Sequence, residues 1–333
     1  MRFSPKAIGI AAAVVTVTIW TAFIVIARAS AGHSLNTFDL TFLRIAGAGA
    51  VLLPWGAWLV RSSGKPGWLG LSPLPFRLTA TIGFFGGLLY AMLAYAGFFY
   101  APATHASVLM PGSLPLWTSL LAIALLGERI KGARAVGLLL IVGGALLVGG
   151  TSLLRAFDGG EVWKGDLLFM SAALCWSTYG VLARRFKLDA VRATIAITVF
   201  AFVCYVPAYL LLALTQVVPS HLFSAPVGEV LFQMLFQGVG SVVISGITFT
   251  QMIRHFGPVR STMITALVPG LSALAAVALL SEPLYWNLLA GLALVTVGIL
   301  FGVREVPRIA PVSIAKDDHL ASGEPRFIVK KPL

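Results

Sequence analysis

Residues 115–128 read PLWTSLLAIALLGE, and residues 269–282 read PGLSALAAVALLSE. Each stretch begins with a proline and ends with a glutamate thirteen residues later, and the two stretches are offset by 154 residues. At the same offset Gly137 corresponds to Gly291. These coincidences follow the order of the apolar segments around them, so they indicate that the chain contains two copies of one unit.

A second pair of motifs marks the same duplication. Trp20 and Arg28 are eight residues apart, and Trp176 and Arg184 repeat that spacing. Each pair spans the end of the apolar segment that opens its copy. The two copies therefore begin near the N-terminus and near residue 160.

The composition is that of a protein that crosses a membrane many times. Of 333 residues 58% are hydrophobic and only 11% are charged, with a mean hydropathy of +0.93. Soluble domains carry about 25% charged residues, so an ordinary soluble enzyme and a disordered chain are both excluded. The formal net charge is +12. However, the basic residues stand between apolar runs rather than in one patch, which favours a lipid bilayer over nucleic acid as the partner.

Ten apolar segments are long enough to be read as membrane spans, each of which needs roughly 20 residues. They cover residues 7–27, 38–59, 78–100, 102–126, 134–150, 165–183, 192–214, 230–253, 258–281 and 286–303. Residues 304–333 contain four prolines and mixed charges, and are predicted to form a flexible cytoplasmic tail.

The positions of Lys and Arg predict the orientation. With both termini in the cytoplasm, twenty of these residues lie on the inner side, and Arg28, Arg155 and Lys164 lie on the outer side. Only Arg44 lies within a span. This bias requires an even number of spans with both ends inside. We expect a multi-pass protein of a bacterial inner (plasma) membrane.

The repeat divides the chain into residues 1–150, residues 160–303 and the tail. Because each half has five spans, the second half must cross the membrane in the opposite direction to the first. Inverted repeats are typical of secondary transporters, whose substrate site lies near the midplane where the halves meet. The sequence thus predicts an all-α integral membrane protein, with ten helices in two inverted five-helix repeats around a central cavity.

The chain resembles the EamA-type ten-helix exporters of the drug/metabolite transporter superfamily. The resemblance rests on Ile19-Trp20 with Arg28, Phe42-Leu43-Arg44, Leu126-Gly127-Glu128-Arg129, Gly165-Asp166, Trp176 and Ser281-Glu282-Pro283. In the last motif the family more often has Gly before the Glu. The resemblance implies a cavity lined by the first four helices of each half, with the fifth helix of each half as a scaffold. It also favours export of amino acids or related metabolites.

Span 230–253 carries a polar stripe at helical spacing. Its members are Gln233, Gln237, Ser241, Ser245, Thr248 and Gln251. Polar side chains in a membrane helix need water, a ligand or another helix. We therefore expect Gln237, Ser241 and Ser245 to bind substrate. Hydrogen bonding between helices is the alternative.

Span 102–126 offers a second candidate surface. Met110, Ser113 and Trp117 share a helix face, beside Pro111 and Pro115. Pro269 lies at the equivalent depth in the other half. Proline removes a backbone donor, and matched interruptions near the midplane are typical of a transporter binding site. A kink that serves only helix packing is the alternative.

Aromatic residues divide by depth. Four tryptophans near span ends are interpreted as interfacial anchors: Trp55, Trp58, Trp163 and Trp286. Deeper aromatic side chains are predicted to form cavity walls or to pack between helices: Trp20, Tyr90, Trp117, Trp176 and Tyr179.

Three polar residues are candidates for ion binding or gating: Asp39, Arg44 and His105. Arg44 is a functional candidate because it lies within a span; alternatively it snorkels outward or pairs with Asp39. His105 either caps a helix or handles protons. Glu128 and Glu282 are predicted to tie neighbouring helices together.

No Asp or Glu lies near the middle of a span, which predicts facilitated diffusion, or coupling through Asp39, His105 or Asp166. A small amphiphilic solute suits such a pathway, and amino acids are the favoured cargo. Exporters of nucleosides or of cationic drugs remain alternatives, although a cationic drug favours a buried carboxylate. A membrane enzyme or sensor is the distant alternative.

We predict that the protein has no catalytic residues and binds no metal or cofactor. We also predict that it functions as a monomer. Cys175 and Cys204 are interpreted as small buried hydrophobes.

Overall fold

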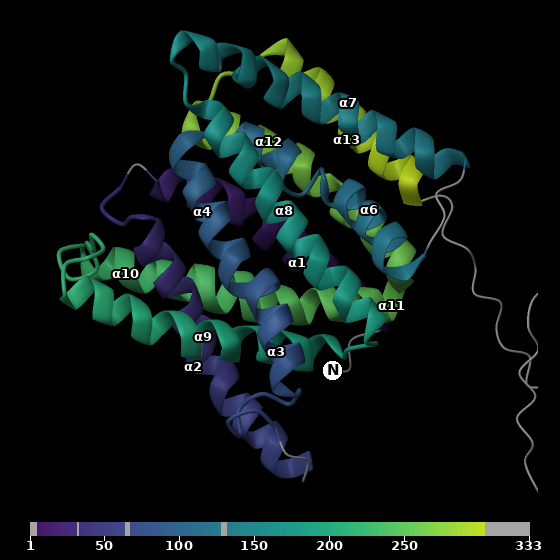
Figure 1. Cartoon of the computed structure of the whole chain (residues 1–333). Coiled ribbons are helices and arrows are strands. Elements are labelled where there is room, and N and C mark those ends of the chain that lie inside the picture. Colours follow the sequence, from purple (N-terminus) through teal and green to yellow (C-terminus); the bar gives the residue numbers. More distant parts are fainter. Residues whose placement is uncertain (1–4, 32, 64–66, 128–131, 304–333) are drawn as a thin grey trace, which may run out of the picture.

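The computed structural model describes residues 5–31, 33–63, 67–127 and 132–303. These residues form a bundle of helices, and the bridge between Trp68 and Ser72 is the only strand-like pairing found among them (Figure 1). The elements in chain order are α1 (Pro5–Ser30), α2 (Thr37–Ser63), α3 (Phe76–Gly83), η1 (Phe84–Leu89), α4 (Tyr90–Tyr100), α5 (Ala103–Leu109), α6 (Leu114–Leu126), α7 (Gly132–Arg155), η2 (Ala156–Asp158), α8 (Val162–Arg185), α9 (Ala190–Leu214), α10 (Val227–Gln233), η3 (Met234–Ile244), α11 (Ser245–Thr265), α12 (Leu267–Leu280) and α13 (Trp286–Val303).

Within these ranges eight helical stretches are long and apolar enough to cross a membrane. They are Lys6–Ser30, Thr37–Ser63, Phe76–Tyr100, Ala103–Leu126, Gly132–Arg155, Val162–Arg185, Ala190–Leu214 and Val227–Phe256. Two shorter apolar helices follow, Leu267–Leu280 and Trp286–Phe301. The predicted class, an all-helical membrane protein, is confirmed.

The boundary predicted between spans 230–253 and 258–281 does not coincide with a helix end. α11 continues to Thr265, and the helix breaks at Ala266 instead. The Gly-Pro pair at 257–258 therefore lies within helical backbone, a position that membrane helices tolerate more readily than soluble ones.

Two helix breaks lie next to prolines, whereas Pro54 and Pro207 lie inside continuous helices. α5 ends at Leu109 and α6 begins at Leu114, so a four-residue turn interrupts the predicted span 102–126. Pro111 lies in this turn and Pro115 lies in the first turn of α6, where the backbone N–H groups have no partner inside the helix. Pro269 lies in the first turn of α12, shortly after the break at Ala266.

Two stretches are wound as π-helix, in which hydrogen bonds join residues five apart. They are η1, inside the predicted span 78–100, and η3, inside the predicted span 230–253. A π-helix has more residues in each turn than an α-helix. The directions of side chains along η3 therefore differ from those that the α-helical spacing of the polar stripe predicts.

Helices α7 and α13 lie side by side along one side of the molecule, at the top of Figure 1. Their backbones touch through glycine: a methyl group at Gly144 would lie 2.6 Å from the carbonyl oxygen of Gly291. A methyl group at Gly298 would lie 2.6 Å from the carbonyl oxygen of Gly137. Small residues let membrane helices approach this closely.

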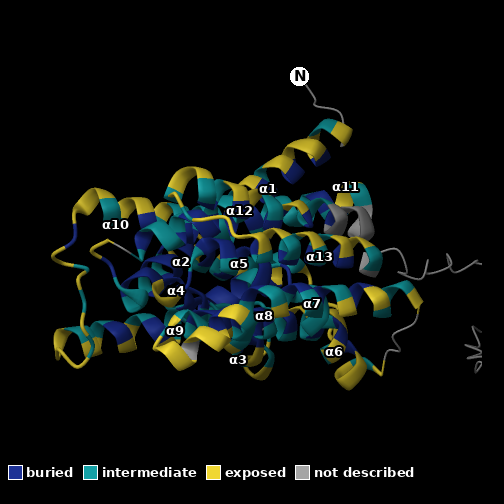
Figure 2. Ribbon diagram, turned by 90° about the horizontal axis from the view of Figure 1, so that it is seen from above, coloured by how far each residue is buried: buried dark blue, intermediate teal, exposed yellow. Residues whose placement is uncertain are grey.

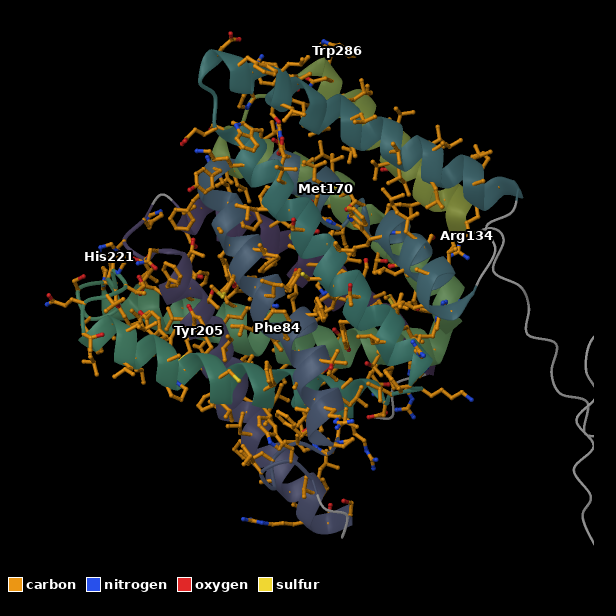
Figure 3. All side chains as sticks on the ribbon, viewed as in Figure 1. Phe84, Arg134, Met170, Tyr205, His221 and Trp286 are labelled. Carbon is orange, nitrogen blue, oxygen red and sulfur yellow. The ribbon has the colours of Figure 1, made fainter. Side chains whose placement is uncertain are left out.

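The buried side chains concentrate in the centre of the bundle, and exposed ones cover its outside (Figure 2). Many exposed residues are large and apolar, as in Leu139 at 71% exposure, which is the pattern of a surface that faces lipid. Trp286 projects from the surface at the top of Figure 3 and is 74% exposed, in agreement with an anchoring position.

The two cysteines differ in burial. Cys175 is buried, but Cys204 is exposed on α9, so the prediction of burial within the protein is wrong for Cys204.

Two predictions fall on residues outside the described ranges. These are the role of Glu128 and the tail 304–333. Both stay predictions.

Candidate functional site

A cavity of about 550 Å³ lies between the helices. Its walls come from α1, α2, η1 with α4, the α5–α6 turn with α6, α8, α9, η3 with α11, and α12. Within the described part of the chain, α7 and α13 contribute no residue to the lining. The volume falls in the range of small-molecule pockets.

The structure brings nine of the residues singled out from the sequence together on this cavity. They are Trp20, Arg44, Tyr90, Met110, Pro111, Trp176, Tyr179, Ser241 and Ser245. They come from both copies of the repeat, from six helical elements and from the α5–α6 turn. Their assignment to substrate binding stays a prediction.

Aromatic rings form two walls of the cavity. The ring of Trp176 lies 5.0 Å from that of Tyr90 and 5.2 Å from that of Tyr179, centroid to centroid. A second pair of rings in the lining, those of Trp20 and Phe249, lie 5.2 Å apart. Such rings offer flat apolar surface to a ring or an aliphatic chain.

Arg44 supplies the buried positive charge of the cavity. It is 9% exposed, and its Nη1 donates hydrogen bonds to the hydroxyl of Ser241 at 2.7 Å and to the carbonyl oxygen of Gln237 at 3.4 Å. Its guanidinium carbon lies 5.2 Å from the centroid of the Phe23 ring and 6.0 Å from that of Tyr90. Arg44 therefore faces the cavity and does not snorkel away from it.

Asp39 does not pair with Arg44. Its fully buried carboxylate accepts hydrogen bonds from the hydroxyls of Tyr209 and Ser220, and from the backbone N–H groups of His221 and Asn36. It thereby fastens the start of α2 to α9 and to the connection that precedes α10. Figure 3 shows His221 in that connection, at the left of the molecule.

Four other predicted residues lie away from the lining. Ser113 is fully buried, and its hydroxyl donates to the carbonyl oxygen of Leu109, which the helix break frees. The indole nitrogen of Trp117 is buried without a hydrogen-bond partner among the described residues. Pro115 and Pro269 lie in the first turns of α6 and α12, next to residues that line the cavity, but they are not part of the lining themselves.

Gln237 belongs to a chain of contacts between helices. Its Nε2 donates to Oε1 of Gln233, whose own Nε2 donates to the Ser30 hydroxyl on α1. Gln237 is fully buried and absent from the lining, so the side chain fits the alternative of interhelical bonding better than that of a pathway. Its backbone carbonyl still reaches the site by accepting from Arg44.

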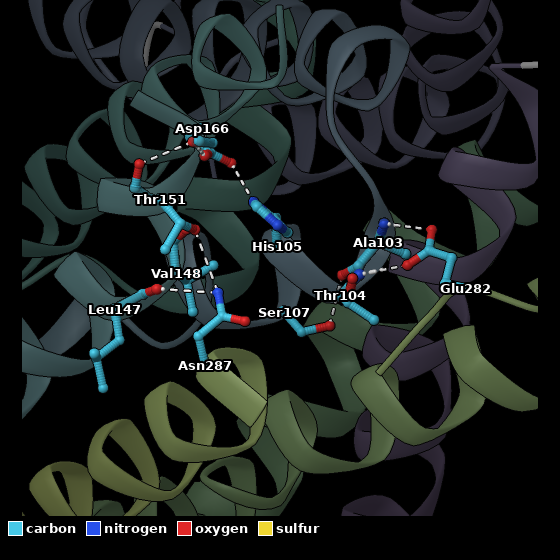
Figure 4. Close-up of polar contacts among 12 residues, drawn as sticks. Ala103, Thr104, His105, Ser107, Leu147, Val148, Thr151, Asp166, Glu282 and Asn287 are labelled. Carbon is cyan, nitrogen blue, oxygen red and sulfur yellow. Dashed lines mark hydrogen bonds and ion pairs between the residues drawn. The ribbon is translucent and has the colours of Figure 1, made fainter. Parts of the chain in front are cut away.

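One end of the bundle is tied by Glu282. Its two carboxylate oxygens accept the backbone N–H groups of Ala103 and Thr104 at 2.8 and 2.9 Å, at the start of α5 (Figure 4). A carboxylate is favourable there because the first N–H groups of a helix are unpaired and carry partial positive charge. Arg28 Nε lies 3.7 Å from the same carboxylate. Glu282 thus joins α12 to α5 and α1, in agreement with its predicted tying role.

His105 lies in a second polar cluster at this end. Its Nδ1 is 2.8 Å from Oδ1 of Asp166, whose other oxygen accepts from the Ser152 hydroxyl (Figure 4). The cluster connects α5, α8 and α7. His105 and Asp166 are largely buried and do not line the cavity.

The cavity reaches the surface at the opposite end. Its lining runs from Arg44 along α11 to Arg254, which is exposed. We call this the basic end, defined by Arg134, Arg184, Arg185 and Arg254; Figure 3 shows Arg134 at the right. We call the other the closed end, defined by Arg28, Asp39, His105 and Glu282.

The sequence did not single out the contribution of α9. Thr194, Ile197 and Thr198 line the cavity, as do Phe249 and Thr250 on α11. The spacing of four between Thr194 and Thr198 in an otherwise apolar span is the available signal, but threonine in a membrane helix also satisfies itself by bonding to its own backbone, as Thr194 does.

No group of three or more His, Cys, Asp or Glu side chains that could hold a metal ion is found in the described ranges.

Comparison with known proteins agrees with this architecture. The EamA-like transporter family matches residues 7–150 and again residues 163–304. The chain belongs to the EamA-like transporter family; it is a membrane transporter. An uncharacterized transporter, YyaM of Bacillus subtilis (strain 168), is 25% identical over 246 residues, which are 73% of this chain and 78% of YyaM. A crystal structure of 25% identity is similar with a TM-score of 0.57, over 91% of this chain and 98% of that one.

Proposed function

We propose that this protein is a secondary transporter that exports small amphiphilic metabolites, in the first place amino acids, across a bacterial inner membrane. It works by alternating access, as two inverted five-helix halves rock about the cavity. The observation that carries the proposal is the cavity itself, which is walled by aromatic rings and hydroxyls from both halves and reaches the surface at one end.

Matched local structure supports two inverted halves. The π-helical segments η1 and η3 occur in the third and eighth predicted spans. α6 ends at Gly127 with a φ of +67°, and α12 ends at Ser281 with a φ of +55°, at the same offset of 154 residues. If the two shorter apolar helices, α12 and α13, are counted as spans, the described residues hold ten, and the family matches the chain twice, which supports the proposal.

The closed end supports alternating access. Contacts there join residues before 150 to residues after 160: Glu282 with the start of α5, Asp39 with Tyr209, and Asn36 with the carbonyl oxygen of Pro219. The structure has the cavity accessible from the basic end, which the distribution of Lys and Arg assigns to the cytoplasm. Release on the other side requires these contacts to separate.

The lining favours small solutes that are partly polar. Hydroxyl groups of Thr194, Thr198 and Ser245 stand among aromatic and aliphatic walls. A buried carboxylate, which a cationic drug favours, is absent from the lining within the described residues. Amino acids match both the size and the mixed polarity of this surface.

A counterflow screen tests the proposal. The purified protein is reconstituted into liposomes loaded with an unlabelled amino acid, nucleoside or cationic dye, and uptake of the labelled compound is followed. We expect counterflow for amino acids with apolar side chains, and no counterflow in protein-free liposomes. Counterflow for dyes or nucleosides alone would replace amino acids as cargo, and the absence of counterflow for every class would refute the proposal.

A further inference from the structure

We infer that Arg44 binds a carboxylate of the carried solute, so that this transporter selects carboxylates with an apolar or aromatic body and does not require an ammonium group. The inference rests on the proposed function and names the chemistry of its substrate. An amino acid satisfies it, and so does the same molecule without its amine.

The charge of the lining is the first argument. Arg44 and Arg254 are the two charged residues among the described lining, and neither forms an ion pair with a described carboxylate. A buried guanidinium inside a membrane protein is costly without a counter-ion. An anion that enters the cavity supplies that counter-ion, whereas an ammonium group there is repelled.

The donors that remain on Arg44 are the second argument. A guanidinium has five N–H donors in a planar fork that matches a carboxylate. The hydrogen bonds that Arg44 makes with normal geometry within the described residues both leave from Nη1. Nη2 and Nε therefore keep donors. The buried Tyr95 hydroxyl also interacts with this guanidinium, through its charge and through a weak side-chain hydrogen bond. Even with one donor given to Tyr95, two of the five donors remain for a ligand.

The surroundings of Arg44 indicate what the rest of the solute looks like. The rings of Phe23 and Tyr90 stand next to the guanidinium, and Trp20 and Trp176 continue the walls. A solute whose carboxylate lies on Arg44 therefore places its body against flat apolar surface. For an ammonium group the described lining offers the hydroxyls of its serine, threonine and tyrosine residues, which are neutral and do not form an ion pair with it.

Arg254 gives the cavity a positive entrance. It is thirteen residues beyond Ser241, about 20 Å along the helix at 1.5 Å per residue. With Arg254 at the exposed end and Arg44 at the buried end, the potential along the cavity draws anions inward.

Three matched ligands test the inference: phenylalanine, 3-phenylpropionate, which lacks the amine, and 2-phenylethylamine, which lacks the carboxylate. Each is added unlabelled as a competitor of labelled phenylalanine counterflow, and each is also added to the detergent-solubilised protein while its melting temperature is measured. We expect phenylalanine and 3-phenylpropionate to compete and to raise the melting temperature, because a ligand that binds the folded state stabilises it. We expect 2-phenylethylamine to do neither.

Variants locate the effect at Arg44. Arg44→Gln is expected to weaken both carboxylate ligands at least about tenfold, since charge-assisted hydrogen bonds are lost. The affinity of Arg44→Lys for the carboxylate ligands is expected to lie between that of the wild type and that of Arg44→Gln, because lysine keeps the charge but lacks the planar set of donors. Arg185→Gln, which is exposed at the basic end and lies outside the cavity lining, is the matched control and is expected to leave the affinities for the three ligands unchanged.

The outcomes separate the inference from the function on which it rests. Equal competition by 2-phenylethylamine and phenylalanine, or an unchanged affinity of Arg44→Gln for both carboxylate ligands, would overturn the carboxylate site while transport stands. Stabilisation by 3-phenylpropionate without counterflow of any amino acid would refute amino acids as cargo and keep the site. The wild-type ligand series needs no variant to fold, so a poorly folded Arg44 variant does not remove the test.

Discussion

At the residue scale, two carboxylates at the closed end are largely shielded from solvent and hold several hydrogen bonds each. Glu282 accepts two backbone N–H groups at the start of α5, and Asp39 accepts four hydrogen bonds from α9, its flanking connection and Asn36. Neither reaches the cavity. These hydrogen bonds therefore hold segments of the chain together at the closed end, and we expect that transport requires them to break.

Glu282 stabilises the fold more through its hydrogen bonds to the N-terminus of α5 than through its ion pair with Arg28. Glu282→Gln loses the charge that two N–H groups share, and we expect a loss of stability of about 1–3 kcal/mol. Arg28 is partly exposed, with 35% of its side chain accessible, so we expect Arg28→Gln to cost less, although it removes both this ion pair and the hydrogen bond that Nη1 donates to the Phe98 carbonyl oxygen. Melting temperatures of Glu282→Gln and Arg28→Gln in detergent compare the two. An equal or larger loss in Arg28→Gln would contradict this assignment.

Ser281 carries backbone strain that its counterpart avoids. Its φ of +55° is in the left-handed region, where the first copy has Gly127 at +67°. Glycine adopts this region without steric cost, whereas other residues do not. We expect Ser281→Gly to stabilise the protein by about 0.5–1 kcal/mol, measured as a higher melting temperature. Ser281→Ala is the control, and stabilisation by alanine instead of glycine would show that the conformation is not the cause.

At the element scale, the sequence predicts helices well and their fine structure poorly. The long apolar runs predict the helices because the bilayer enforces length and hydropathy. The π-helical winding of η3 leaves no such signal, and neither does the division of its polar residues, in which Gln237 bonds to Gln233 while Ser241 bonds to Arg44. The partner of Asp39 was equally invisible, because Tyr209 lies 170 residues away in the chain.

The pairing of α7 with α13 depends on glycine at the contact. A methyl group at Gly144 would lie 2.6 Å from the Gly291 carbonyl oxygen and 2.7 Å from a methyl group of Val295. At Gly143 the nearest atom would be 3.8 Å away. We expect Gly144→Ala to destabilise the protein by about 1–3 kcal/mol, and Gly143→Ala to be neutral or slightly stabilising. Equal melting temperatures for both variants would contradict the close contact.

At the scale of the whole molecule, the candidate site could be predicted in part. The large aromatic residues and the arginine could be predicted because each stands out in an apolar span. In the structure most of them line the cavity together. Thr194 and Thr198 were missed because their signal does not differ from that of threonine bonded to its own helix. The two-copy pattern of the sequence has structural counterparts in the paired π-helices and the paired helix ends at Gly127 and Ser281.

The central claim is that solute occupies a cavity that opens in turn at the two ends of the bundle. Thr250 lines the cavity, whereas Leu139 is 71% exposed on α7 and faces lipid. We place a single cysteine at either position after replacing Cys175 and Cys204, and label it with a membrane-impermeant thiol reagent added to right-side-out or inverted vesicles.

We predict that Thr250→Cys is labelled fastest from the face that the basic end occupies, more slowly from the other face, and that a transported solute slows both reactions. We predict no labelling of Leu139→Cys from either face. Labelling of Thr250→Cys that is absent from both faces, or that no transported solute affects, would contradict the account.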